Sequence, residues 1–186
     1  MAAQPDLTLL TAEQFLGIEW GSDIKAELDN GVIRMMAGGT RAHARVQMNL
    51  YSFLRGALRG SGCRPFGSDM AVRTHDLSVR YPDMSVDCHG DAASEDEEKT
   101  LRDPRVVIEI LSPTTRRQDE GVKLNEYRAL GGIDTIVFID PVAERLRVLQ
   151  RTGPDAWSDR THPAPADLHL PALGLVVPHA EIFARD

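Results

Sequence analysis

The longest regular pattern of apolar positions along this chain has the period of an α-helix and covers residues 41–59. Its apolar residues recur every three or four positions: Val46, Leu50, Phe53, Leu54 and Ala57. This spacing predicts an amphipathic helix with one side packed against a core. Thr40 is suited to cap its N-terminus, and the Gly60-Ser61-Gly62 segment is suited to end it.

Most other apolar segments are short and are typical of β-strands. They predict a hairpin over residues 24–36, extended segments over 63–73 and 168–177, and strands over 83–88, 105–112, 135–141, 145–149 and around Trp157. Further helical segments are predicted over 11–20, 117–130 and 178–183. Strands and helices do not alternate regularly, which indicates an α/β protein with a mixed sheet rather than a doubly wound one.

Residues 105–112 form a strongly apolar strand that contains one acid. Its two faces are Val106, Ile108 and Ile110 on one side, and Val107, Glu109 and Leu111 on the other. A strand that is apolar on both faces lies in the interior of a sheet. A carboxylate in that position is costly unless it is paired or coordinates a metal. Glu109 therefore predicts either a buried ion pair or a metal site.

Two further acid-containing patterns flank this strand. Asp83 follows Pro82 in another β-prone segment, and we interpret it as lying within a strand that the proline opens. In the helix predicted over 117–130, Asp119, Lys123 and Tyr127 are four residues apart and therefore form one stripe. Either Asp119 and Lys123 form an ion pair on a solvated face, or Lys123 reaches the carboxylates of the two strands.

Length and charge restrict the function classes. A chain of 186 residues suits one domain with a substantial core. Its net charge of −7 counts against a large non-specific nucleic-acid surface, but a bound cation with a local arginine cluster remains compatible with a nuclease. Several arginines are available for such a cluster: Arg55, Arg59, Arg64, Arg73, Arg80, Arg116 and Arg117. Their scatter along the chain makes a solvated surface the default interpretation.

The cysteine and hydropathy patterns favour a cytoplasmic protein. Cys63 and Cys88 have no metal-ligand or redox spacing, so we expect two buried free thiols in a reducing compartment. No apolar run approaches the roughly 18 residues of a membrane span. The first residues lack the basic and apolar regions of a signal peptide. The polar residues 89–103, with the acidic run 95–98, are predicted to form a surface excursion.

The order of these motifs resembles a known nuclease family. Its elements are Pro82-Asp83, Glu109-Ile110-Leu111-Ser112-Pro113, Asp119, Lys123 and Tyr127. They resemble the restriction-endonuclease-like (PD-(D/E)XK) superfamily and, within it, the bacterial Uma-two-type endonucleases, over residues 11–183. The resemblance implies an α/β fold with a restriction-endonuclease-like αβββαβ core. Its mixed central sheet would be flanked by helices and extended by an N-terminal hairpin and extra C-terminal strands.

The resemblance also implies a metal site. Asp83, Glu109 and the main-chain carbonyl of Ile110 are the expected ligands of Mg²⁺, with Mn²⁺ as an alternative. The superfamily commonly carries its catalytic lysine two residues after the second acid, where this chain has Leu111. The family pattern implies that the lysine has moved to the following helix, as Lys123.

Five further residues have implied roles at this site. His43 is either a packing residue near the N-terminus of its helix or a catalytic residue suited to metal binding or proton transfer. Glu27 is either an accessory acid or an exposed strand glutamate. Asp119 would hold Lys123, Tyr127 would position Lys123, touch a phosphate or simply pack, and Ser112 is a supporting residue. Ser112 has neither an evident base partner nor a nucleophile-elbow motif, so a serine mechanism is not favoured.

The implied function is metal-dependent hydrolysis of nucleic acid, with DNA as the favoured substrate and a homodimer as the favoured assembly. Two alternatives remain open. One is an inactive nuclease fold that acts as a binding or scaffold module, which the acidic net charge favours slightly. The other is a phosphodiesterase for a small nucleotide, which needs no broad basic groove. A zinc enzyme is disfavoured because no His and Cys cluster has ligand spacing.

Overall fold

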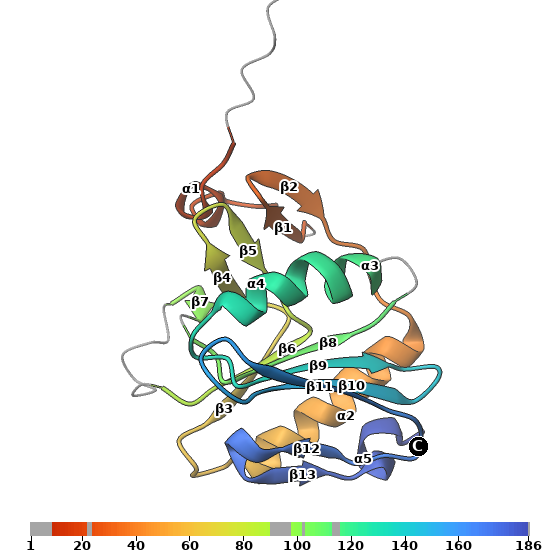
Figure 1. Ribbon diagram of the computed structural model, residues 1–186. Helices are drawn as coiled ribbons and strands as arrows, with labels where there is room; N and C mark the ends of the chain where they lie inside the picture. The colour runs from red at the N-terminus through yellow and green to blue at the C-terminus, as the bar shows by residue number, and fades with distance from the viewer. Residues whose placement is uncertain (1–8, 22–23, 90–97, 102, 113–115, 186) are drawn as a thin grey trace, which may run out of the picture.

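The computed structural model describes residues 9–21, 24–89, 98–101, 103–112 and 116–185. Its larger sheet has six strands, in the order β11 (Trp157–His162), β10 (Arg145–Arg151), β9 (Thr135–Asp140), β8 (Val106–Ile110), β6 (Met84–Asp87) and β3 (Arg64–Gly67). The β8–β9 pair is parallel, and the other pairs of this sheet are antiparallel. The sheet is therefore mixed, as the sequence predicts, with β8 near its centre (Figure 1).

A second sheet lies above the first in the view of Figure 1. Its order is β2 (Val32–Met35), β1 (Ala26–Asp29), β5 (Ser78–Arg80), β4 (Ala71–His75) and β7 (Thr100–Leu101). The predicted N-terminal hairpin is β1–β2. Asn30 and Gly31 form its turn at φ values of 48° and 82°, the left-handed region that this turn type needs. The hairpin does not stand alone, because Leu28 of β1 pairs with Val79 of β5.

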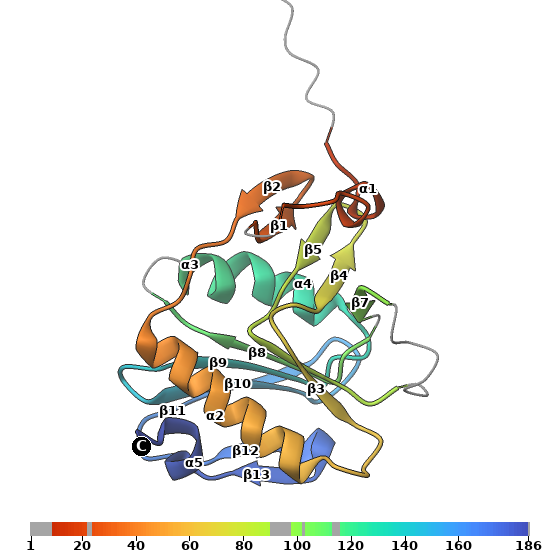
Figure 2. The same ribbon diagram turned by 180° about the vertical axis from the view of Figure 1, so that it is seen from behind.

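Helices cover both faces of the six-stranded sheet (Figures 1 and 2). Helix α2 (Arg41–Ala57) covers one face. On the other face, α3 (Arg116–Gln118), the π-helical turn η1 (Asp119–Lys123) and α4 (Leu124–Ala129) form one continuous helical segment between the two sheets. The predicted helix over 117–130 is thus present, and its π turn is marked by the Leu124 N–H, which donates to the Asp119 carbonyl.

The remaining elements pack at the two ends of the molecule. They are α1 (Ala12–Leu16), β12 (Leu168–Leu170), the 3₁₀ turn η2 (Pro171–Leu173), β13 (Leu175–Val177) and α5 (His179–Phe183). The segment predicted as extended over 168–177 is therefore a short hairpin interrupted by a helical turn. No helix in the described ranges is long and apolar enough to cross a membrane.

The apolar pattern of β8 connects two hydrophobic cores. Val106, Ile108 and Ile110 face the core that contains the buried side of α2. On the opposite face, Val107 packs in the core that contains Tyr127 of α4. All five residues of β8 are buried, as expected for a central strand that is apolar on both faces.

The structure corrects the expectation of free thiols. Cys63 and Cys88 form a disulfide, with their Cα atoms 4.0 Å apart. Cys63 immediately precedes β3 and Cys88 immediately follows β6, and Arg64 pairs with Asp87 in these antiparallel strands. The register therefore brings the two cysteines opposite each other, although 25 residues separate them in the sequence.

The positions of Asp83 and Arg80, which both precede β6 in the sequence, also differ from the predicted ones. Asp83 does not lie within a strand but in the bend that immediately precedes β6. Arg80, interpreted by default as a solvated residue, is fully buried in β5. Residues 95–97 of the acidic run 95–98, and residues 113–115, lie outside the described ranges.

Candidate active site

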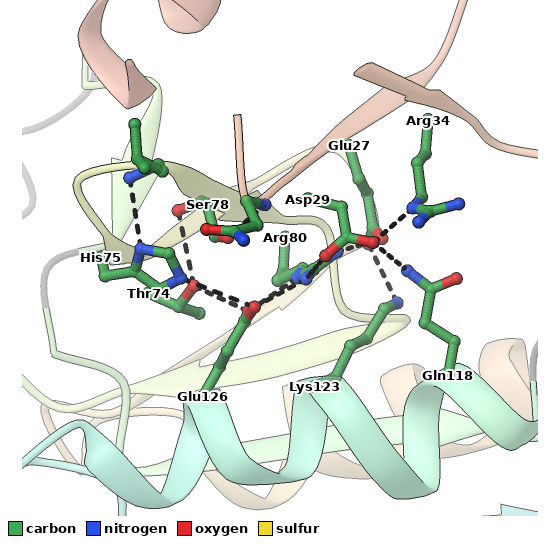
Figure 3. A network of polar contacts seen from close by, with 12 residues as sticks. Glu27, Asp29, Arg34, Thr74, His75, Ser78, Arg80, Gln118, Lys123 and Glu126 are labelled. Carbon is green, nitrogen blue, oxygen red and sulfur yellow. Dashed lines mark hydrogen bonds and ion pairs between the residues drawn. The ribbon is translucent and has the colours of Figure 1, made fainter. Parts of the chain in front are cut away.

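A buried lysine lies at the centre of a carboxylate cluster between the two sheets. The Nζ atom of Lys123 lies 2.9 Å from Oε1 of Glu27, 3.2 Å from Oδ1 of Asp119 and 3.3 Å from Oε1 of Glu109. These acids come from β1, the π turn and β8. Figure 3 shows Lys123 pointing from its helix toward Glu27. The cluster therefore joins both sheets to the helical segment between them.

Glu109 accepts two donors from that helical segment. The Tyr127 hydroxyl donates to its Oε1 atom at 2.7 Å, and the Lys123 ammonium lies near the same oxygen. Glu109 is only 3% exposed, and burial raises the pKa of its carboxyl to about 8, with a decrease from Lys123 and further increases from Asp119, Asp83 and Glu27. The low-dielectric environment thus favours the neutral acid.

The neighbouring donors keep their protons. Burial lowers the pKa of Lys123, but the surrounding carboxylates Glu109, Glu27 and Asp119 raise it more, so it lies above its usual value. Burial and the nearby acids hold the pKa of Tyr127 well above its usual value. Lys123 is therefore a cation at neutral pH and is suited to donate hydrogen bonds, not to act as a base.

Asp83 and His43 form the more accessible part of the site. Asp83 Oδ2 accepts the Ile110 N–H at 2.7 Å and lies 3.1 Å from Nε2 of His43. The Asp83 carbonyl accepts a hydrogen bond from Gln47 at 2.8 Å. The side chains of His43 and Asp83 are 14% and 18% exposed, so this edge contacts solvent.

The pKa of His43 lies above its usual value. The largest cause is its hydrogen bond to Asp83; burial opposes it, and the charge of Asp83, the charge of Asp119 and the Ile110 carbonyl reinforce it. Thr40 caps the start of α2, since its hydroxyl accepts the His43 N–H at 3.2 Å. The helix start therefore directs the imidazole toward the bend before β6.

The structure places the sequence-predicted residues as follows. It brings together Glu27, His43, Asp83, Glu109, Ile110, Asp119, Lys123 and Tyr127. Glu27 is 5% exposed and is not a surface glutamate. The pair of Asp119 and Lys123 is buried and does not lie on a solvated face. Ser112 lies just after β8, where its carbonyl accepts the Arg116 N–H at 3.0 Å and begins α3.

A second buried cation extends the cluster and was not predicted. Arg80 donates to Asp29 at 2.7 Å and to both carboxylate oxygens of Glu126 at 2.7 Å (Figure 3). Its Nη1 atom lies 3.5 Å from Oε2 of Glu27. Glu126 is three residues after Lys123 and therefore shares its helical face, which is the one sequence signal that connects it to the site.

The oxygen atoms of the site include donors of the kind that a hard metal ion needs. Among the residues that the structure describes, no group of three His, Cys, Asp or Glu side chains is arranged to hold a metal ion. The set that remains is Asp83, Glu109, the Ile110 carbonyl and water, all of them hard oxygen donors of the kind that Mg²⁺ prefers. In the surrounding network, Lys123, Arg80 and the more exposed Arg34 face five acids: Glu27, Asp29, Glu109, Asp119 and Glu126. A divalent cation bound here would favour the ionised form of Glu109, which a metal ligand needs.

Comparisons with known proteins identify the family and the fold of this chain. The model of the Uma2 family, described as "Putative restriction endonuclease", matches residues 12–179. A crystal structure titled as "a putative nuclease belonging to DUF820" from Anabaena variabilis is similar, with a TM-score of 0.74. The two sequences are 20% identical, and the match covers 94% of this chain and 98% of the other. At this identity the similarity establishes the fold.

Two curated proteins from Synechocystis are also similar. The "Uncharacterized protein slr1290" is 25% identical over 167 residues, which cover 89% of this chain and 87% of that protein. The "Uncharacterized protein sll1609" is 26% identical over 150 residues, which cover 80% and 85%. The similarity therefore spans most of each protein. The resemblance and the fold class inferred from the sequence are confirmed by the family and structure comparisons.

Proposed function

This chain belongs to the Uma2 family, and on that premise we propose that it is a metal-dependent endonuclease that hydrolyses phosphodiester bonds in nucleic acid. One observation carries the proposal. The buried Lys123 contacts the carboxylates of Glu27, Asp119 and Glu109. Glu109 lies near the end of the central strand β8, and the N–H of the next residue, Ile110, binds a fourth carboxylate, that of Asp83. A buried carboxylate with a strongly raised pKa beside a more accessible one is the kind of perturbed group that is found at functional sites.

Asp83, Glu109 and the Ile110 carbonyl are the proposed ligands of Mg²⁺, with Mn²⁺ as an alternative. Bound there, the cation would neutralise a phosphate and lower the pKa of a water molecule. Lys123 remains protonated, so its role is to orient the attacking water or to stabilise negative charge that develops on the phosphate. Asp119 and Glu27 hold the ammonium in place through charge-assisted contacts.

His43 and Tyr127 have separate proposed roles. The imidazole of His43 lies at the solvent-accessible edge and holds a proton more strongly than usual, which suits transfer to a leaving oxygen. Tyr127 is fully buried and donates to Glu109, so it positions that carboxylate and does not contact substrate. Ser112 supports the site through the start of α3.

A second candidate is a nuclease fold that binds a partner without cutting. One observation favours it: protein donors already satisfy Oδ2 of Asp83 and Oε1 of Glu109. In an active enzyme, metal binding must reorganise at least some of these contacts. A small-nucleotide phosphodiesterase would keep the same chemistry on a shorter substrate.

The test is a calorimetric titration of Mg²⁺ and Mn²⁺ into wild type, Asp83→Asn and Glu109→Gln, beside cleavage assays on plasmid, single-stranded DNA and RNA. We expect binding and cleavage to be lost together in both variants. Asp159→Asn is a matched control, because Asp159 lies on the edge strand β11 and pairs with Arg147, which is not a residue of the candidate site. Cleavage of plasmid on both strands would favour a homodimer, which light scattering can measure directly.

Each outcome separates the candidates. Metal binding without cleavage of any polymer would favour the small-nucleotide enzyme. Full cleavage by either acid variant would refute the assigned ligands. Absence of metal binding in wild type would leave the acids as structural residues and favour the binding module.

A further inference from the structure

The outer face of α2 carries exposed arginines at both ends in a chain whose net charge is −7. The helix contains three arginines and one histidine but no acid, and Arg59 follows it closely. Arg41, Arg55 and Arg59 are exposed, whereas Val46 and Leu50 on the opposite side are fully buried. This helix is therefore a basic element on a protein that otherwise repels polyanions.

An arginine pocket lies at the C-terminal end of this face. The cavity has a volume of about 390 Å³, and its lining includes Arg55, Leu58, Arg59, Cys63, Arg64 and Pro65. Arg55 in the last turn of α2 and Arg59 in the turn that follows both line this cavity. Guanidinium groups bind phosphate oxygens through paired hydrogen bonds. The pocket thus combines a concave shape with the donors that a phosphate needs.

Arg64 contributes less free charge to the pocket than the other two arginines. Its guanidinium donates to the His89 carbonyl at 3.3 Å, and it stands opposite Asp87 in the β3–β6 pair. The disulfide between Cys63 and Cys88 fixes the wall on which it lies. Arg55 and Arg59 are therefore the main charge determinants of the pocket, and they are the residues to test.

The basic face connects the pocket to the candidate active site. Arg41 lies in the first turn of α2, at the start of this face. His43 lies in the same turn, and its side chain contacts Asp83. Figure 2 shows α2 running from the region of α3 to the region of β3. A helix of 17 residues is about 25 Å long, which corresponds to about seven base pairs at 3.4 Å per pair.

We propose that the arginine pocket binds a backbone phosphate of the nucleic-acid substrate, about seven base pairs from the phosphate that is cut. The substrate would follow the outer face of α2 and pass its N-terminal turn to reach Asp83. The exposed arginines lie at the two ends of this face, with Met48 between them, so a polymer can contact both ends, whereas a mononucleotide reaches only one. This inference rests on the proposed function and specifies its substrate as a polymer.

The test is a binding titration by fluorescence anisotropy in EDTA, so that no metal-dependent cleavage occurs. Duplexes of four, six, eight, ten and twelve base pairs are compared on wild type and on the double variant Arg55→Glu/Arg59→Glu. We expect wild-type affinity to rise sharply between about six and ten base pairs. The double variant should bind longer duplexes at least about tenfold more weakly, with a salt slope reduced by about 2.

Arg160→Glu is the matched control, because Arg160 is an exposed arginine on β11, away from the pocket lining. Thermal melting checks that the double variant remains folded, which we expect because both substituted side chains are exposed. Equal effects of the control and the double variant would overturn the pocket assignment and leave only general electrostatic attraction.

Two further outcomes would overturn the inference. If wild type cleaves polymers and the double variant keeps the same affinity and salt slope, the proposed function stands but the pocket does not bind substrate. If inorganic phosphate shifts the NMR signals of the pocket residues, but the double variant binds duplexes as tightly as wild type, the pocket binds free phosphate only. A wild type that neither binds nor cuts nucleic acid would overturn the proposed function as well.

Discussion

The Nζ atom of Lys123 lies 2.9 Å from Oε1 of Glu27, although Lys123 belongs to the helical segment on the six-stranded sheet and Glu27 to the five-stranded sheet. Both side chains are buried. The contact therefore connects the stability of the two-sheet arrangement to the geometry of the candidate active site. A change at either residue should alter both properties.

Replacing Lys123 by Met should strongly destabilise the protein and abolish cleavage. Removing one partner of a buried ion pair leaves uncompensated charge and costs about 3–5 kcal/mol. Urea denaturation at neutral pH measures this loss. Lys25→Met is the control, because Lys25 pairs with Asp69 at an exposed surface where the expected loss is below about 1 kcal/mol. The destabilisation by Lys123→Met should shrink at lower pH, as the carboxylates take up protons.

The free energy of unfolding of the Glu109→Gln variant should increase relative to that of wild type as pH rises. The folded-state pKa of Glu109 is about 8 against an ordinary value of 4.5, so folding favours the protonated form. The contribution of this group is fully present below pH 4.5 and is lost as pH rises through 8. Gln cannot ionise, so the difference in unfolding free energy between variant and wild type should move in favour of the variant from pH 5 to pH 9.

Chemical denaturation in EDTA at pH 5, 7 and 9 measures this difference for Glu109→Gln. A difference that does not change with pH would mean that Glu109 is ionised throughout and that Lys123 compensates its burial. Glu126→Gln is a useful comparison, because Glu126 contacts Arg80 and lies outside the proposed ligand set.

Replacing Gly39 by Ala should displace His43. A Cβ atom at Gly39 would lie 2.8 Å from Nδ1 and 2.9 Å from Cγ of the imidazole, closer than van der Waals contact allows. The ring should then lose its contact with Asp83, and the pKa of His43 should fall toward its usual value. NMR titration of the His43 ring measures the pKa shift independently of activity.

Gly38→Ala is the matched control for Gly39→Ala, since a Cβ atom there has no neighbour within 4 Å. If His43 acts in proton transfer, the cleavage pH profile should shift with its pKa in the Gly39 variant alone. Equal behaviour of the two variants would show that the ring position does not depend on Gly39.

Removing the disulfide by Cys63→Ser/Cys88→Ser should destabilise the protein by about 2–4 kcal/mol, because a link between residues 25 positions apart restricts the unfolded chain. The melting temperature of wild type should fall in reductant, and that of the double variant should be insensitive to it. A wild type whose melting temperature does not respond to reductant would contradict a structural role for this bond.

Local patterns predicted much of the fold. The apolar spacing of residues 41–57 predicts α2, and the Asn30-Gly31 turn predicts the β1–β2 hairpin. The stripe formed by Asp119, Lys123 and Tyr127 is also present, because residues four apart share a helical face even where the helix contains a π turn. In each case the signal depends on neighbours within a few residues.

The sequence by itself therefore determined most of the elements, the buried acid in β8 and the family. Only the tertiary structure decided which of the acids Lys123 meets, that Arg80 is buried against Glu126, and that Cys63 lies opposite Cys88. The pairs Cys63–Cys88, Arg80–Glu126 and Glu27–Lys123 join residues 25, 46 and 96 positions apart, where 96 is the difference between residues 123 and 27. They depend on strand register and on how the two sheets pack across one helix, and no period along the chain encodes either quantity.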